Sequence, residues 1–194
     1  MEGLDEFAWL NPPEFSQRRS DGLFVRTAEK TDFWRGTFYG FHPDSGHVFG
    51  RWVDGDFTAT ATFAGDYREL YDQAGVMVRA NADHWVKAGI EFSDGVKNLS
   101  AVVTNVNSDW SVIPLPGHEG DVTVRVTRHA DAVRVQYRDG GAWRMARLAW
   151  LKPHASLFVG MMCCSPLRAG FEVVFKDFTI GPPIARDLHE PQPA

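Results

Sequence analysis

The stretch Tyr71–Ser111, YDQAGVMVRANADHWVKAGIEFSDGVKNLSAVVTNVNSDWS, decides the fold. Three segments in it alternate between apolar and polar residues, and two turn sequences separate them. Because successive side chains of a strand point to opposite faces, this alternation predicts three antiparallel strands that share one buried face. The turns, at 81–83 and at Asp94-Gly95, are typical of tight hairpins.

The register of the first two strands follows from matching their apolar faces. This register is inferred from parity, and a shift by two residues would keep the same faces and is the alternative that parity leaves open. The predicted pairs are Gln73 with Glu91, Gly75 with Gly89, Met77 with Lys87, and Arg79 with Trp85.

The polar face of this hairpin is the candidate site. Lys87 and Glu91 stand roughly 13 Å apart along their strand, too far to pair directly. Gly75 and Gly89 lie between the two ends, and a glycine pair weakens a strand unless something must approach the backbone closely. We therefore expect a hollow over the two glycines that binds a ligand. The predicted binding residues are Gln73, Gly75, Trp85, Lys87, Gly89, Glu91, Thr104 and Trp110.

Length and composition predict one domain. The chain has 194 residues and 44% hydrophobic content, enough for a sizeable core. About ten or more short strands and no amphipathic helix longer than two turns predict an all-β, two-sheet antiparallel jelly-roll sandwich over 1–181. The proline-rich segment 182–194 is expected to be a disordered tail.

Charge and hydropathy narrow the class of partner. The formal net charge is −5 and no run of Lys and Arg is present, which argues against nucleic acid. No segment approaches the roughly 20 apolar residues that span a bilayer, so no membrane partner is predicted. The N-terminal sequence MEGLDEF lacks the apolar region of a secretory signal, which predicts a cytoplasmic protein.

Neither the cysteines nor the histidines predict a cofactor. Cys163 and Cys164 are adjacent, so a bond between them would be strained, and two buried thiols are favoured over a redox switch. His42, Asp44 and His47 have the right types for a metal, but their spacing fits no familiar ligand motif. We predict a loop there and neither metal nor cofactor.

The stretch 31–41, TDFWRGTFYGF, carries five aromatic residues. Such density is typical of packing between a sheet and a loop, and it also suits a wall on which a ligand stacks. Trp34 is expected to pack in the core.

Several motifs in order resemble a known family. They are Thr31–Arg35, Tyr71–Gly75, Trp85–Glu91, Val103-Thr104, Ser108–Ser111 and Cys164–Pro166. The set resembles a family of unknown function named after a yeast regulator of enolase, within the concanavalin A-like lectin/glucanase superfamily. The resemblance covers about 10–181 and implies the jelly-roll fold, but no reaction.

In that superfamily the concave sheet usually binds carbohydrate, and its enzymes place two catalytic acids there. The E-x-D-x-x-E strand of one glucanase branch is absent, because the chain reads IEFSDGV around Glu91. An enzyme would have to combine Glu91 with Asp72, since glycoside hydrolysis needs a pair of carboxyl groups.

Three functions remain open. The favoured one is a non-catalytic module that binds a carbohydrate, a sugar phosphate or another small anionic ligand on the polar face. The second is a protein-interaction or regulatory module, as the enolase regulator suggests. The third is a glycoside-active enzyme that uses Glu91.

Overall fold

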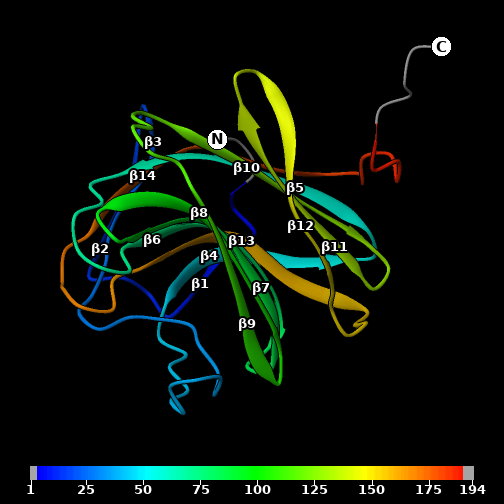
Figure 1. The fold of residues 1–194 in the computed structure, drawn as a ribbon, viewed down its shortest axis with the longest axis horizontal. Coiled ribbons are helices and arrows are strands. Elements are labelled where there is room, and N and C mark those ends of the chain that lie inside the picture. The colour runs from blue at the N-terminus through cyan, green and yellow to red at the C-terminus, as the bar shows by residue number, and fades with distance from the viewer. Residues whose placement is uncertain (1–3, 190–194) are drawn as a thin grey trace.

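The chain folds into two stacked antiparallel sheets of seven strands each, in a computed structural model that describes residues 4–189 (Figure 1). The first sheet has the order β1 (Ala8–Leu10), β4 (His47–Asp54), β13 (Ser156–Cys164), β6 (Gln73–Asn81), β7 (His84–Ser93), β8 (Val96–Asn105), β9 (Asn107–Pro114). The second has the order β12 (Ala142–Trp150), β11 (Ala132–Asp139), β10 (Val122–His129), β5 (Phe57–Gly65), β14 (Glu172–Gly181), β3 (Gly22–Arg26), β2 (Phe15–Arg19). No helix occurs within 4–189, which confirms the all-β sandwich.

The core fills the space between the sheets, as the alternation predicts. Ala74, Val76 and Val78 of β6 are fully buried there, and Val86, Ala88 and Ile90 of β7 are almost fully buried beside them. Phe57, Ala59, Ala61 and Phe63 of β5 face them from the second sheet. Burying apolar surface at about 25 cal/mol per Å² is the main force that holds the sheets together.

The predicted register of β6 and β7 is confirmed. Gln73 pairs with Glu91, Gly75 with Gly89, Met77 with Lys87, and Arg79 with Trp85. The β7–β8 hairpin turns at Asp94 and Gly95, whose φ angles of 54° and 77° are those of a two-residue turn with both central residues left-handed.

The glycine pair allows close approach within the sheet itself. A Cβ atom on Gly89 would lie 2.0 Å from the carbonyl oxygen of Ala74, and one on Gly75 would lie 2.1 Å from that of Ala88. The cavity beside Gly89 measures about 10 Å³, close to the minimum for one water molecule. The close approach that the glycines predict is therefore made by the neighbouring strand, and a hollow of ligand size does not form over them.

The loop between β3 and β4, residues 27–46, covers part of the outer face of the first sheet (light blue, bottom of Figure 1). Phe33 of this loop is fully buried in a second apolar cluster. The other buried members are Val48, Met77, Trp85, Val102, Met162 and Cys164. Part of the outer face is thus buried beneath the loop, and a cavity remains between the loop and the rest of this face.

Cys163 and Cys164 are both free and buried, and they point to opposite faces of β13. Cys163 belongs to the core between the sheets and Cys164 to the cluster beneath the loop. Burial raises the pKa of both thiols, so neither is ionised near neutral pH. The prediction of two buried thiols is confirmed.

The segment after β14 contacts the second sheet at Ile184 and Asp187. The amide of Ile184 donates to Thr58 Oγ1 at 3.0 Å, and the carbonyl of Asp187 accepts from Arg134 at 2.7 Å. The rest of the tail predicted at 182–194 lies outside the described residues. Within 4–189 no helix is long and apolar enough to cross a membrane.

Candidate functional site

Lys87 lies at the centre of a polar network on the outer face of the first sheet. Its ammonium group donates to the carbonyl of Phe33 at 2.8 Å, to Gln73 Oε1 at 2.7 Å and to Asp32 Oδ1 at 3.1 Å. The residue is 4% exposed. Burial lowers the pKa of Lys87, but the charge of Asp32 and other groups raise it above its ordinary value, so the group stays charged.

Asp32 brings the loop onto the sheet. Its Oδ1 accepts from Lys87, from Gln73 Nε2 at 3.3 Å and from the amide of Phe33 at 2.8 Å. Its side chain is 19% exposed, so a carboxylate edge faces open space. Asp32 belongs to one of the family motifs but is not among the predicted site residues, because a residue in a loop has no face parity.

Glu91 stands at the other end of the same polar face. Its Oε2 accepts from Ser100 at 3.3 Å, and Ser100 Oγ accepts in turn from Trp110 Nε1 at 3.1 Å. Burial raises the pKa of Glu91 to about 7, while the charge of Lys87 opposes the rise and that of Asp32 adds to it. The carboxyl group can therefore accept or donate a hydrogen bond near neutral pH.

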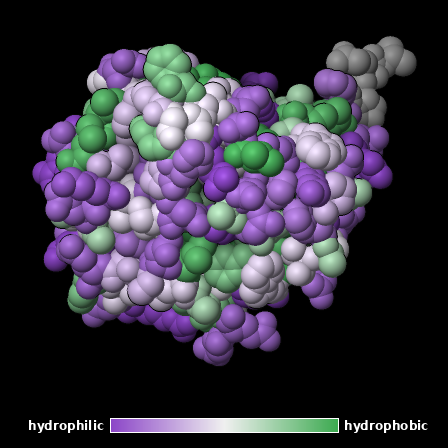
Figure 2. All heavy atoms as spheres, turned by 90° about the horizontal axis from the view of Figure 1, so that it is seen from below, coloured by the Kyte–Doolittle hydropathy of each residue, from purple (hydrophilic) through white to green (hydrophobic). Residues whose placement is uncertain are grey.

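A cavity of about 390 Å³ opens between these groups and the loop. Its polar floor is made by Asp32, Gln73, Lys87 and Glu91, and its lining also includes five aromatic residues, Trp34, Tyr39, Phe41, Tyr71 and Trp110. The size suits a small-molecule ligand. On the face seen in Figure 2, apolar side chains gather in small groups on a mainly hydrophilic surface.

The aromatic walls come from two directions. Tyr39 and Phe41 of the loop stack with ring centroids 5.1 Å apart. Tyr71, in the turn before β6, and Trp110 of β9 meet edge to face at 6.5 Å. The hydroxyl groups of Tyr39 and Tyr71 lie 3.4 Å apart and join the two walls. Of the two interpretations of the 31–41 stretch, packing applies to Phe33, and the wall applies to Tyr39 and Phe41.

The structure brings together half of the predicted site residues. Gln73, Lys87, Glu91 and Trp110 line the cavity. Trp85 is 1% exposed and donates to the carbonyl of Ala82 at 3.1 Å, and Thr104 is fully buried against Ser108. Gly75 and Gly89 do not line the cavity either. Trp34, expected in the core, lines it, as do Asp32, Tyr39, Phe41 and Tyr71, which were not among the predicted binding residues.

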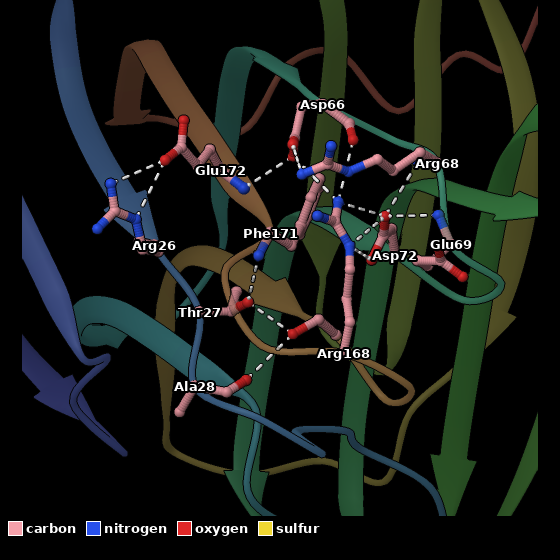
Figure 3. A network of polar contacts seen from close by, with 11 residues as sticks. Arg26, Thr27, Ala28, Asp66, Arg68, Glu69, Asp72, Arg168, Phe171 and Glu172 are labelled. Atoms are coloured by element: carbon pink, nitrogen blue, oxygen red, sulfur yellow. Dashed lines mark hydrogen bonds and ion pairs between the residues drawn. The ribbon is translucent and has the colours of Figure 1, made fainter.

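Asp72 is held within a network of hydrogen bonds and ion pairs, shown in Figure 3. Arg168 donates to both of its carboxylate oxygens at 2.7–3.1 Å, and the amides of Arg68 and Glu69 donate to Oδ2 at 3.1 and 3.0 Å. Its side chain is 1% exposed and does not line the cavity. The carboxylate that an enzyme would have to combine with Glu91 is thus fully engaged elsewhere.

Two of the three candidate metal ligands at 42–47, Asp44 and His47, have protein partners. Arg79 binds Asp44 through two hydrogen bonds of 2.7 and 2.8 Å. His47 accepts from the amide of Ala28 at 3.0 Å, and its other ring nitrogen lies 2.7 Å from the carbonyl of Asn11. Over residues 4–189, no three His, Cys, Asp or Glu side chains are grouped as a metal would require.

Glu91 is expected to make stability fall as the pH rises from about 4.5 to about 7. Its pKa moves from 4.5 to about 7 on folding, so between these values the folded protein holds a proton that the unfolded chain releases. This contribution is complete below pH 4.5 and is lost as the pH rises through 7. Urea unfolding from pH 5 to pH 8 should show the wild type losing about 2 kcal/mol relative to Glu91→Gln. A difference that stays constant with pH would contradict the assignment.

The comparisons with known proteins agree with this fold. A family model described as "Protein of unknown function (DUF1349)" matches residues 9–183. The relative named "Regulation of enolase protein 1" from Saccharomyces cerevisiae is 43% identical over 188 residues, which cover 96% of this chain and 95% of the relative. The crystal structure of a functionally unknown protein from S. cerevisiae has a TM-score of 0.89 at 43% identity and covers 94% of this chain and 99% of its own.

Two more distant structures share the architecture. The carbohydrate-binding module CBM66 from Bacillus subtilis has a TM-score of 0.58 at 12% identity and covers 91% of this chain and 95% of its own. The GH43 protein BlXynB from Bacillus licheniformis has a TM-score of 0.65 at 12% identity, and the match covers 91% of this chain and 36% of that one. At such identities the likeness shows the fold alone. The match over residues 9–183 and the 43% identity to the yeast relative place the chain in the DUF1349 family, as its motifs predict.

Proposed function

We propose that the protein is a non-catalytic binding module that takes a sugar or sugar phosphate in the cavity over β6, β7 and β8. One observation carries this proposal: a cavity of about 390 Å³ combines aromatic walls with a floor of an amide, an ammonium and two carboxyl groups. Sugar rings stack their apolar faces on aromatic side chains, and their hydroxyl groups need donors and acceptors at the edge.

The floor offers both kinds of hydrogen-bonding partner. Among the described residues, Ser100 alone donates to the Glu91 side chain, so this carboxyl group keeps capacity for ligand hydroxyl groups. Lys87 has three partners within the protein, which makes it a rigid positive charge rather than a mobile donor. A ligand with hydroxyl groups near Glu91 and negative charge near Lys87 would match this pattern.

The setting of the acids favours binding over hydrolysis. Asp72 is held by Arg168, and Asp32 is paired with Lys87. Glu91 therefore has no second, unengaged carboxylate beside it in the cavity lining, whereas glycoside hydrolysis uses two carboxyl groups in defined roles. The distant likeness to CBM66 and to GH43 proteins concerns the fold alone, so it does not favour binding over hydrolysis or the reverse.

Calorimetric titration with a panel of monosaccharides, oligosaccharides and sugar phosphates tests the proposal. Saturable binding should weaken about 10-fold or more in Glu91→Gln, which replaces a carboxyl oxygen by an amide NH₂ group, and by about 10-fold in Trp110→Ala, which loses a stacking surface. Trp150→Ala is the matched control, because Trp150 is exposed on β12 and does not line the cavity. Absence of heat across the panel would contradict the proposal.

A second candidate is a protein-interaction module. The tip of the 27–46 loop presents Phe38, which is 93% exposed, next to half-exposed Tyr39 and Phe41, and exposed aromatic residues are frequent anchors of interfaces. The name of the yeast relative makes enolase the first partner to try. Binding of purified enolase that is lost in Phe38→Ala and retained in Glu91→Gln would favour this function. The cytoplasmic location remains a prediction from the sequence.

A further inference from the structure

A second cavity lies on the outer face of the second sheet, the sheet opposite the proposed sugar site. It measures about 150 Å³ and lies against β10, β11, β12 and the segment after β14. Its lining contains three side chains with N–H donors and three apolar ones, and no acid: His129, Ala132, Arg134, Leu148, Arg186 and Leu188.

Arg134 is a buried cation without a carboxylate partner within 4–189. It is 6% exposed, and its guanidinium donates to neutral groups, the carbonyl of Asp187 at 2.7 Å and Gln136 Oε1 at 3.1 Å. The same oxygen of Gln136 also accepts two hydrogen bonds from Arg125. Burying a charge is costly unless an opposite charge accompanies it, so the arrangement leaves a place for an anion.

Neighbouring charges increase this local excess. Burial lowers the pKa of Arg125, and the positive charges of Arg134 and Arg138 lower it further. The whole chain carries a formal charge of −5, so this cationic cluster is a local feature of one sheet. A nearby anion would relieve the repulsion among these guanidinium groups.

Two more donors border the cavity. Arg186 makes no ion pair within the described residues, and its exposed position lets the guanidinium follow a ligand. His129 Nε2 is buried and has no hydrogen-bond partner in the described part of the chain, while its Nδ1 lies 4.0 Å from Asp56. Leu148 and Leu188, which are both about half exposed, form part of the apolar lining of the cavity.

We propose that this cavity is an anion site that binds the phosphate group of a small phosphorylated ligand through Arg134 and Arg186, with His129 as a third donor. The planar fork of a guanidinium group matches the oxygens of phosphate, and two forks around one cavity match its several acceptors. The volume holds a phosphate group and a short extension, with the remainder of the ligand in solvent.

The site is tested by titrating the full chain with inorganic phosphate while the backbone amide chemical shifts are measured by NMR. Saturable shifts should map to β10, β11 and the segment after β14. Arg186→Gln and Arg134→Gln should each weaken binding about 10-fold or more, because each removes a charge-assisted hydrogen bond. Arg144→Gln is the matched control, since Arg144 is exposed on β12 and pairs with Asp139 at 3.6 Å.

The variants distinguish phosphate binding at this site from phosphate binding in the proposed sugar cavity. Loss of phosphate binding in Glu91→Gln with retention in Arg186→Gln would place the phosphate in the first cavity and overturn the proposal. Equal weakening by Arg144→Gln, or no saturable shift, would overturn it as well. Acetate that binds as tightly as phosphate would overturn the assignment to phosphate. If Arg134→Gln fails to fold, Arg186→Gln still decides, because Arg186 lies on the exposed terminal segment.

Discussion

Replacement of Lys87 by methionine is expected to lower the free energy of unfolding by about 3–5 kcal/mol. Methionine fills similar space, but it leaves the Asp32 carboxylate, the Phe33 carbonyl and Gln73 Oε1 without their shared donor. Removing one partner of a buried pair leaves the other charge uncompensated, which is the costly case. Urea unfolding at neutral pH, monitored by tryptophan fluorescence, measures the change.

Lys152→Met is the control for the loss of charge, because Lys152 is exposed. It should change stability by less than about 0.5 kcal/mol. Adding Asp32→Asn to Lys87→Met should recover part of the loss, since it removes the unpaired carboxylate. A Lys87→Met protein as stable as the control would show that the network contributes little to the fold.

Gly89→Ala is expected to destabilise the protein by about 3 kcal/mol, the upper end of the usual cost of overpacking. The new Cβ atom would lie 2.0 Å from the carbonyl oxygen of Ala74 and 2.5 Å from the Cα atom of Gly75. Both contacts are with backbone, so no side chain can rotate away and β6 must separate from β7. Thermal and urea unfolding should both show the loss.

Gly181→Ala is the matched control at the end of β14, where a new Cβ atom would meet nothing within 4 Å. It should be neutral or slightly stabilising, because alanine has less backbone freedom to lose on folding. If Gly89→Ala unfolds at the same temperature and urea concentration as this control, β6 and β7 have space for a Cβ atom at the glycine pair.

The fold was predictable because it depends on local alternation. In Gln73–Asn81 and His84–Ser93 every second residue is apolar, so parity gives the buried face. Parity also allows the observed pairing of Gln73 with Glu91, although a shift by two residues would have kept the same faces. The turn residues Asp94 and Gly95 then fix the next hairpin. These signals act between neighbours in sequence, and the sequence displays them directly.

Only half of the candidate site was predictable. Parity assigns each strand residue to a face of the sheet, but it does not say which part of that face a loop will bury. Trp85 and Lys87 share a face, yet the loop buries Trp85 under Phe33 and leaves a cavity beside Lys87. Asp32 and Tyr39 enter that cavity from an irregular loop, whose path has no periodic signal. The aromatic density of 31–41 was a sign of such a wall, but it favoured packing between the sheet and the loop.

The glycine pair illustrates the same limit. Parity places Gly75 opposite Gly89, and this pairing is observed. Whether an absent side chain makes room for a ligand or for the next strand depends on backbone distances that sequence does not contain. Here the adjacent strand takes the room, and the cavity forms where Gln73 and Glu91 face the loop.

The opposite orientations of Cys163 and Cys164 give the protein two natural reporters of motion. An alkylating reagent can reach Cys164 when the 27–46 loop lifts, whereas Cys163 requires separation of the sheets themselves. The ratio of the two labelling rates therefore distinguishes opening of the loop over the cavity from global unfolding, without any engineered probe.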